Sequence, residues 1–208
     1  MLRTKTVDDF LEELASQSPA PGGGSVAALA AALGSALASM VCRLTLGKKK
    51  YFEVQAEMEE ALVRSDTLRR QAAGLMDEDA EAFNQVMAAY CLSKDSDDQA
   101  VLRQAAIQQA VKEAIRIPLE VMRLAEESFQ LVQTVAEKGN KNSASDAGVA
   151  ALMLRAAMDG ALLNVRTNLP AITDKEFASS VCREADDIKK RVNEVAEQTM
   201  AMVADRLS

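Results

Sequence analysis

One aspartate stands in the middle of an apolar helical face between residues 68 and 90. Leu75, Asp79 and Phe83 follow one another at intervals of four residues, so their side chains share one face of a helix. The other apolar positions of this face are Leu68, Ala72, Met76, Val86 and Tyr90. An ionised carboxylate on a core face is costly unless it is paired or hydrogen-bonded. Asp79 is therefore either a structural partner of a buried arginine or of a helix N-terminus, or the carboxylate of a functional site.

The absence of histidine narrows the chemistry that the chain can perform. Proton transfer must use a carboxylate, lysine, tyrosine, cysteine or water, and a histidine-ligated metal site is excluded. Partial burial would raise the pKa of Asp79 towards the range that is useful for proton transfer. No metal site is expected, because the neighbouring carboxylates point away from this face: Asp77, Glu78 and Glu81.

A second polar pattern lies between residues 146 and 168. Asp146, Asn164 and Asn168 fall on the same helical stripe as Ala150 and Ala157. Asp146 also lies where it could merely cap a helix. Asp146 and Asn164 are 18 residues apart, or roughly 27 Å along a helix, so they cannot both touch one small group within one subunit. If both are functional, either the ligand is long or the site combines two subunits.

Two loops could hold an anion. Glycines without side chains let a ligand approach the backbone N–H groups at a helix N-terminus, although a tight turn between helices explains the same residues. The glycine-rich loop consists of Pro21, Gly22, Gly23, Gly24 and Ser25. The other loop holds the only run of three basic residues, which is either a solvated loop or a site for carboxylates: Lys48, Lys49 and Lys50.

The elements that must position these residues are helices. Alanine and leucine dominate, aromatic residues make up 3% of the chain, and there is no tryptophan, so few residues favour strands. Apolar periodicity and capping residues predict helices over about 7–15, 25–46, 51–92, 96–138, 146–169 and 173–207. We expect an all-α fold, an antiparallel bundle of about six long helices with short loops, built as a single domain over residues 1–208.

Composition also limits the partners and the compartment. A net charge of −7 argues against nucleic acid and anionic membranes. The most apolar stretch, Val26–Cys42, is shorter than the ~20 residues of a membrane span, and the acidic N-terminal segment does not resemble a signal peptide. The three cysteines are widely spaced and lack a Cys-x-x-Cys motif, which is typical of reduced thiols in the cytoplasm: Cys42, Cys91 and Cys182.

Taken together, the unusual segments resemble the cyclodeaminase domain of the formiminotransferase-cyclodeaminase family, which also includes stand-alone bacterial methenyltetrahydrofolate cyclohydrolases. The resemblance covers nearly all 208 residues. In chain order, it rests on SPAPGGGSVAALAAALG, GKKKY, LMDEDAEAFNQVMAAY, IPLEV, GNKNSASDAGVAALML and ALLNVRTNLP. The formiminotransferase domain is absent, so the transferase activity is not expected here.

The resemblance implies an all-helical subunit, a homodimer, folate substrates and a link to histidine degradation. Cyclodeamination converts 5-formiminotetrahydrofolate to 5,10-methenyltetrahydrofolate and ammonia, and is the main expectation. Cyclohydrolysis of methenyltetrahydrofolate to 10-formyltetrahydrofolate is the alternative. A non-catalytic folate-binding or scaffold protein is a third possibility of a different class. No prosthetic group is implied beyond the tetrahydrofolate-borne substrate.

The resemblance places the site at the glycine-rich loop, the GNxNxxSD loop (Gly139–Asp146) and Asp79. We expect Asp79 to stabilise the amidinium-like cation and to move the proton, with Asp146 as the second choice. The three lysines would hold a glutamate tail, which carries further carboxylates when polyglutamylated. The polar side chains expected to bind the substrate are Ser25, Asn140, Asn142, Ser145, Asn164 and Asn168.

Overall fold

The computed structural model describes all 208 residues and contains helices but no strands. The six α-helices are α1 (Val7–Leu14), α2 (Gly23–Thr45), α3 (Gln55–Tyr90), α4 (Asp97–Lys138), α5 (Ala144–Asn168) and α6 (Lys175–Leu207). Four short 3-10 helices accompany them: η1 (Leu2–Thr4), η2 (Lys49–Val54), η3 (Lys141–Ser143) and η4 (Leu169–Ala171). The predicted all-α class is confirmed.

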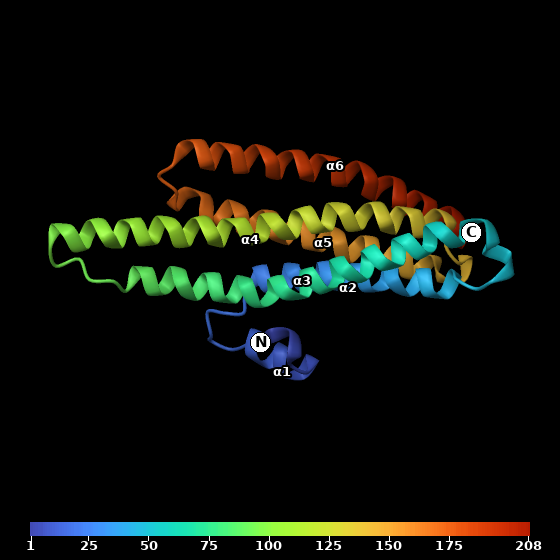
Figure 1. Cartoon of the computed structure of the whole chain (residues 1–208), viewed down its shortest axis with the longest axis horizontal. Coiled ribbons are helices and arrows are strands. Elements are labelled where there is room, and N and C mark those ends of the chain that lie inside the picture. The colour runs from blue at the N-terminus through green and yellow to red at the C-terminus, as the bar shows by residue number, and fades with distance from the viewer.

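Five long helices lie side by side in an elongated bundle, each antiparallel to the one before it, while α1 lies to one side (Figure 1). Helix α2 packs against α3 and α5, and α4 packs against α3, α5 and α6. The helices share one core of 47 buried residues. The antiparallel order places the start of α2 against Asp79 of α3, and the end of α2 against Asn140 in the loop that follows α4.

Several helix starts differ from the sequence prediction, since α3 begins at Gln55 and not at 51, and α5 begins at Ala144 and not at 146. Ser25, where the helix over 25–46 was predicted to begin, lies inside the first turn of α2, which begins at Gly23 after the N-cap Gly22. The helix over 173–207 was predicted to begin at Thr173, but Asp174 caps α6 by accepting a hydrogen bond from Phe177 N–H. Thr173 instead donates its backbone N–H and its hydroxyl to Gln108 Oε1, both at 2.8 Å. At the starts of α2 and α6, the side chain at the predicted first residue forms a hydrogen bond with a residue distant in sequence: Ser25 with Asp79, and Thr173 with Gln108.

About half of the most apolar part of α2, and likewise of α5, is buried inside the bundle. The prediction that the stretch in α2 is too short for a membrane span was wrong: α2 has 23 residues and a mean hydropathy of 1.9 over its most apolar window, of which 61% is buried. A window within Lys141–Ala171 has a mean hydropathy of 1.3 and is 50% buried. By length and composition alone both helices could span a membrane, but the buried core helix of a soluble protein passes the same test.

Both α2 and α5, which pack against each other, expose large apolar side chains, and these are called here the α2/α5 face. The two helices approach closely, because a Cβ on Gly34 of α2 would lie 2.7 Å from Leu154 Cγ of α5. No charged residue occurs in α2 before Arg43. The large apolar side chains exposed on this face are Val26, Leu33, Leu44, Val149, Leu152 and Leu163.

Candidate active site

Asp79 lies against the first turn of α2, at the edge of a cavity of about 260 Å³. Its Oδ2 accepts a hydrogen bond of 2.8 Å from the Ser25 hydroxyl. No arginine or lysine forms an ion pair with it. The cavity is lined by residues of the glycine-rich loop, α3, α4 and α5: Pro19, Ala20, Gly22, Gly23, Gly24, Asp79, Phe83, Val86, Ala114, Asn164, Thr167 and Asn168.

Burial raises the pKa of the Asp79 carboxyl above its ordinary value, against the opposing effect of hydrogen bonds from the Ser25 side chain and backbone. Of the two structural partners considered from the sequence, the helix N-terminus is the one that Asp79 contacts. The same carboxyl also lines the cavity, so it serves the fold and is open to a ligand.

The anion that lies at the glycine-rich loop is not the one we expected. We expected its backbone to face an anionic ligand, but the anion at this helix N-terminus is Asp79 of the same chain. A Cβ on Gly24 would lie 2.0 Å from Asp79 Oδ1, so only glycine leaves room for the carboxylate. Ser25 is fully buried and hydrogen-bonded to Asp79, and its hydroxyl also lies 3.1 Å from the Met76 carbonyl. Ser25 therefore positions Asp79 instead of contacting a ligand itself.

Two asparagines of α5 face the same cavity. Asn164 Nδ2 donates to Gly160 O at 2.9 Å, and Asn168 Nδ2 donates to Ala114 O and Asn164 O. These bonds fix both amide groups and use one N–H of Asn164 and both N–H groups of Asn168. The Oδ1 atoms remain as acceptors on the side of α5 that lines the cavity. Asp79, Asn164 and Asn168 together thus present acceptors suited to a ligand rich in N–H groups.

The predicted residues of the other two loops form a second cluster at the opposite end of α2. Lys48, Lys49 and Lys50 are exposed, and no carboxylate lies within ion-pair distance of them. Asn142 and Ser145 are exposed, and Asp146 is half-buried in the first turn of α5. This second cluster is called here the lysine cluster. Its three lysines form a local basic surface on an acidic protein, as an anion site requires.

Asn140 organises the lysine cluster from within and is closed to a ligand. Only 7% of it is exposed. Its backbone N–H donates to Thr45 Oγ1 at 2.8 Å, its Nδ2 donates to Leu44 O at 3.0 Å, and its Oδ1 accepts from Asn142 N–H at 3.2 Å. The expectation that Asn140 hydrogen-bonds the substrate is corrected, since the fold uses all of its polar groups.

Sequence reasoning missed Tyr51. Its hydroxyl donates to Asn140 Oδ1 at 3.4 Å and accepts the Lys141 backbone N–H at 2.9 Å, which joins the lysine run to the Gly139–Asp146 loop. A signal was available, because the chain has only two tyrosines and no histidine, and one tyrosine directly follows the three lysines. Phe83 was recognised only as an apolar position, yet it lines the cavity beside Asp79.

The two clusters are far apart within one subunit. Helix α2 has 23 residues, and so spans about 34 Å from its first turn, where Gly24 lies against Asp79, to Thr45 beside Asn140. Asp79 and the lysines therefore cannot contact the same small group of one ligand in one subunit.

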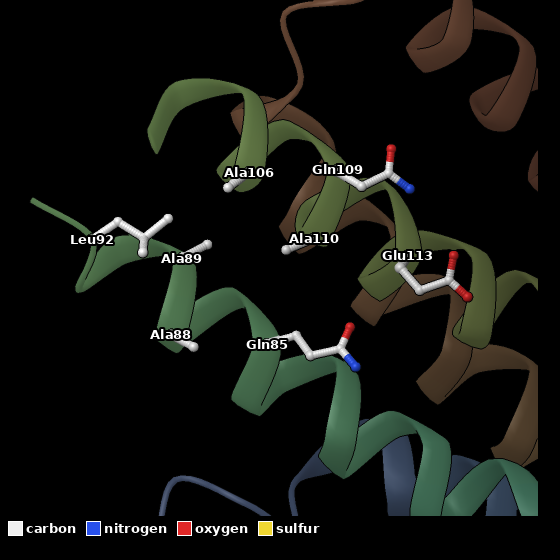
Figure 2. A pocket seen from close by; sticks show the side chains of 8 residues that line it. All are labelled: Gln85, Ala88, Ala89, Leu92, Ala106, Gln109, Ala110 and Glu113. Carbon is white, nitrogen blue, oxygen red and sulfur yellow. The ribbon is translucent and has the colours of Figure 1, made fainter. Parts of the chain in front are cut away.

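A wider hollow of about 660 Å³ lies between the end of α3 and the beginning of α4. Figure 2 shows Ala89 and Leu92 facing Ala106 and Ala110 across this gap. Its one charged residue, Glu113, forms an ion pair with Arg116 at 3.0 Å. The hollow contains none of the predicted site residues, so the smaller cavity at Asp79 is the better candidate.

Comparison with known proteins places these features in a family. The model of the formiminotransferase-cyclodeaminase family matches residues 6–187. The chain belongs to this family. A methenyltetrahydrofolate cyclohydrolase of Methylorubrum extorquens is 42% identical over 208 residues, which cover the whole of both chains. A crystal structure of formiminotetrahydrofolate cyclodeaminase from Thermotoga maritima covers all of both chains with a TM-score of 0.90 and 30% identity.

The bifunctional members of the formiminotransferase-cyclodeaminase family are longer. The formimidoyltransferase-cyclodeaminase of Sus scrofa is 34% identical over 203 residues, which cover 98% of this chain but only 37% of that protein. The chain thus spans about a third of these relatives and the whole of the cyclohydrolase. The resemblance stated from the motifs is confirmed.

Proposed function

We propose that this protein is an enzyme that acts on the carbon between N5 and N10 of tetrahydrofolate. The observation that carries the proposal is a desolvated carboxylate, Asp79, which lines a cavity without a cationic partner from the chain. Such a group is suited to a ligand that brings its own positive charge, as a formimino or methenyl folate does. Family membership supports the same substrate class.

In cyclodeamination, ionised Asp79 takes the proton of N10 as this nitrogen bonds to the formimino carbon. A tetrahedral carbon then lies between N5, N10 and the formimino nitrogen. The formimino nitrogen of the cationic substrate is by then an NH2 group; Asp79 returns its proton to it, the carbon–nitrogen bond breaks, and ammonia leaves. The carboxylate then faces the methenyl cation, which it stabilises by charge.

Cyclohydrolysis is the second candidate, favoured by 42% identity over the full length of a cyclohydrolase. Here Asp79 takes a proton from water as the oxygen bonds to the methenyl carbon. The proton is passed to N5 as the carbon–N5 bond breaks, and a second proton is released when the formyl group forms on N10. Both reactions pass through a tetrahedral carbon between two nitrogens, so one carboxylate serves either.

We infer that the remaining contacts divide between the head and the tail of the folate. The Oδ1 atoms of Asn164 and Asn168 accept hydrogen bonds from the pterin, and Phe83 supplies an apolar surface beside it. The lysine cluster binds the carboxylates of the glutamate tail, with Lys141 as a further exposed cation. Asn142 and Ser145 add hydrogen bonds there, and Asp146 is the second candidate for proton transfer.

The complete site is proposed to form between two subunits of a homodimer. A two-fold axis on the α2/α5 face would set two copies of α2 antiparallel, which brings the glycine-rich loop of one subunit near the lysine cluster of the other. The same contact would cover the exposed apolar side chains of this face, which otherwise lie in water. One ligand could then reach both Asp79 and a lysine cluster, although the two lie about 34 Å apart within a subunit.

No metal or prosthetic group is part of the proposal, since the folate itself carries the reactive carbon. A cytoplasmic location is proposed as well. It is supported by three cysteines that form no disulfide.

The function is tested by giving the purified protein 5-formiminotetrahydrofolate and methenyltetrahydrofolate in parallel. Formation or loss of the methenyl compound is followed by absorbance, and ammonia release is measured separately. Turnover of the first substrate identifies a cyclodeaminase, and turnover of the second a cyclohydrolase. Folate-induced thermal stabilisation without turnover of either would replace the proposal with a binding protein, and no effect at all would favour a scaffold.

The shared site predicts complementation between two defective variants. Asp79→Asn disables the head of the site, and a triple Lys48→Ala, Lys49→Ala, Lys50→Ala variant disables the tail. When the two are co-expressed, half of the dimers are mixed and each has one intact site, so about a quarter of the wild-type kcat/KM should return at low substrate concentration. Activity that stays at the level of the separate variants would place the whole site within one subunit.

A further inference from the structure

The end of α6 is tied to the loop of the lysine cluster by one arginine. Arg206 lies in the last turn of α6 and reaches the end of α4. Its Nη1 donates to the carbonyls of Ala136 and Glu137, and its Nη2 donates to the carbonyl of Gly139, each at 2.6 Å. One guanidinium thus binds three carbonyls that would otherwise end the helix without partners.

These carbonyls lie where α4 ends and the Gly139–Asp146 loop begins, so the contact of Arg206 acts on this loop in particular. Helix α4 ends at Lys138, and the Gly139 N–H already bonds to Val135 O. Gly139 is tightly enclosed, because a Cβ there would lie 2.8 Å from Val41 Cγ1 of α2. Asn140 follows directly and anchors the loop to the end of α2. The first two residues of the loop are therefore fixed from two sides, by Arg206 of α6 and by the end of α2.

The cationic side chain also suits the electrostatics of its position. The C-terminal end of a helix carries partial negative charge, which a guanidinium stabilises. A lysine could supply the charge but not the planar fork that reaches three carbonyls at once. Arg206 lies beyond residues 6–187, the part of the chain that the family model matches.

We propose that Arg206 is a positioning residue for the folate site: by clamping the end of α4, it holds the Gly139–Asp146 loop in the conformation that binds the substrate. The inference rests on the proposed function for its effect on turnover, and on the three hydrogen bonds alone for its effect on the loop. Arg206 itself does not touch the reacting carbon in this scheme.

The test compares Arg206→Gln and Arg206→Lys with a matched control, Arg191→Gln. Arg191 also joins α6 to α4, through hydrogen bonds of 2.5 and 3.2 Å to the Glu126 carboxylate, but Glu126 lies within α4, about three helical turns before the loop. Each protein is assayed for KM and kcat with the preferred folate. Hydrogen exchange of peptides spanning residues 136–148 and the melting temperature are measured on the same samples.

The expected result is a fall in kcat/KM of about tenfold or more for both Arg206 variants, mostly through KM, because the loop contacts the bound substrate. Exchange in residues 139–146 should speed up in both variants. Arg191→Gln should lose similar thermal stability with unchanged KM and loop exchange. Arg206→Lys keeps the charge and so keeps the fold testable if Arg206→Gln unfolds.

Loop exchange and KM that are the same in the Arg206 variants as in Arg191→Gln would overturn the proposal. If the wild-type protein turns over neither folate, the proposed function fails by itself. Loop exchange then decides whether Arg206 positions the loop.

Discussion

Asp79→Asn is expected to reduce the turnover of either folate by about 100-fold or more, the usual size of a general acid–base contribution. Asparagine keeps the shape of the side chain and can still accept the Ser25 hydroxyl, but it carries neither the charge nor the transferable proton. The loss should therefore appear in kcat more than in KM. The matched control is Glu78→Gln, which neutralises an exposed carboxylate next to it in sequence. Equal turnover in Asp79→Asn and wild type would remove Asp79 from the mechanism.

The pH dependence follows from the raised pKa of Asp79. Both reactions begin with the ionised carboxylate, so wild-type activity should fall as the pH drops through this raised pKa. For stability the sign is opposite. A carboxyl whose pKa is raised by folding favours the folded state while it is protonated, and this contribution is lost as the pH rises through the folded pKa. Asp79→Asn should therefore be at least as stable as wild type at neutral pH, with the difference disappearing in acid.

Gly24→Ala is expected to be more damaging than any other substitution in the protein that adds a single methyl group. Its Cβ would lie 2.0 Å from Asp79 Oδ1 and 2.5 Å from Asp79 Cγ, so the carboxyl must leave the N-terminus of α2 or the helix must shift. Overpacking of this kind costs about 1–3 kcal/mol of unfolding free energy. Displacement of the carboxylate should also reduce turnover by about 100-fold, as small errors in position do.

Gly74→Ala is the control for this prediction. Gly74 lies on α3, the helix that carries Asp79, and a Cβ there would be 3.7 Å from Glu78 Oε1, an ordinary contact. Alanine in a helix interior should raise stability by about 0.5–1 kcal/mol and leave turnover unchanged. Denaturant unfolding and the folate assay check both variants. If Gly24→Ala behaves as Gly74→Ala does, the close contact of Asp79 with α2 is not present in solution.

The fold was largely predictable from local patterns, and the site only partly. Helix α4 begins after Ser96 and ends at Lys138 as expected, because capping and apolar periodicity are local properties. Asp79 was found because one charge on an apolar face breaks a regular pattern. A helix N-terminus was considered as its partner, but which helix was not found: that the glycine-rich loop of α2 accommodates Asp79 depends on how α2 and α3 cross, which the spacing of residues does not encode.

The lysine cluster shows the same limit. Asn140 and Ser25 were recognised as unusual polar residues, but their contacts with Thr45 and Asp79 are tertiary, so a supporting role looked like a binding role. Tyr51 and Arg206 matter through backbone groups of a distant loop. No periodicity or motif in the sequence connects them to it.

The single hydroxyl proton of Ser25 has two acceptors within reach, Asp79 Oδ2 at 2.8 Å and the Met76 carbonyl at 3.1 Å. When Asp79 is ionised, the hydroxyl can donate to it. When Asp79 holds a proton, the hydroxyl can rotate to Met76 and accept from the carboxyl instead. The protein can thus stabilise either charge state by turning one O–H bond. A carboxyl that collects and returns a proton in every cycle would then need no rearrangement of its surroundings.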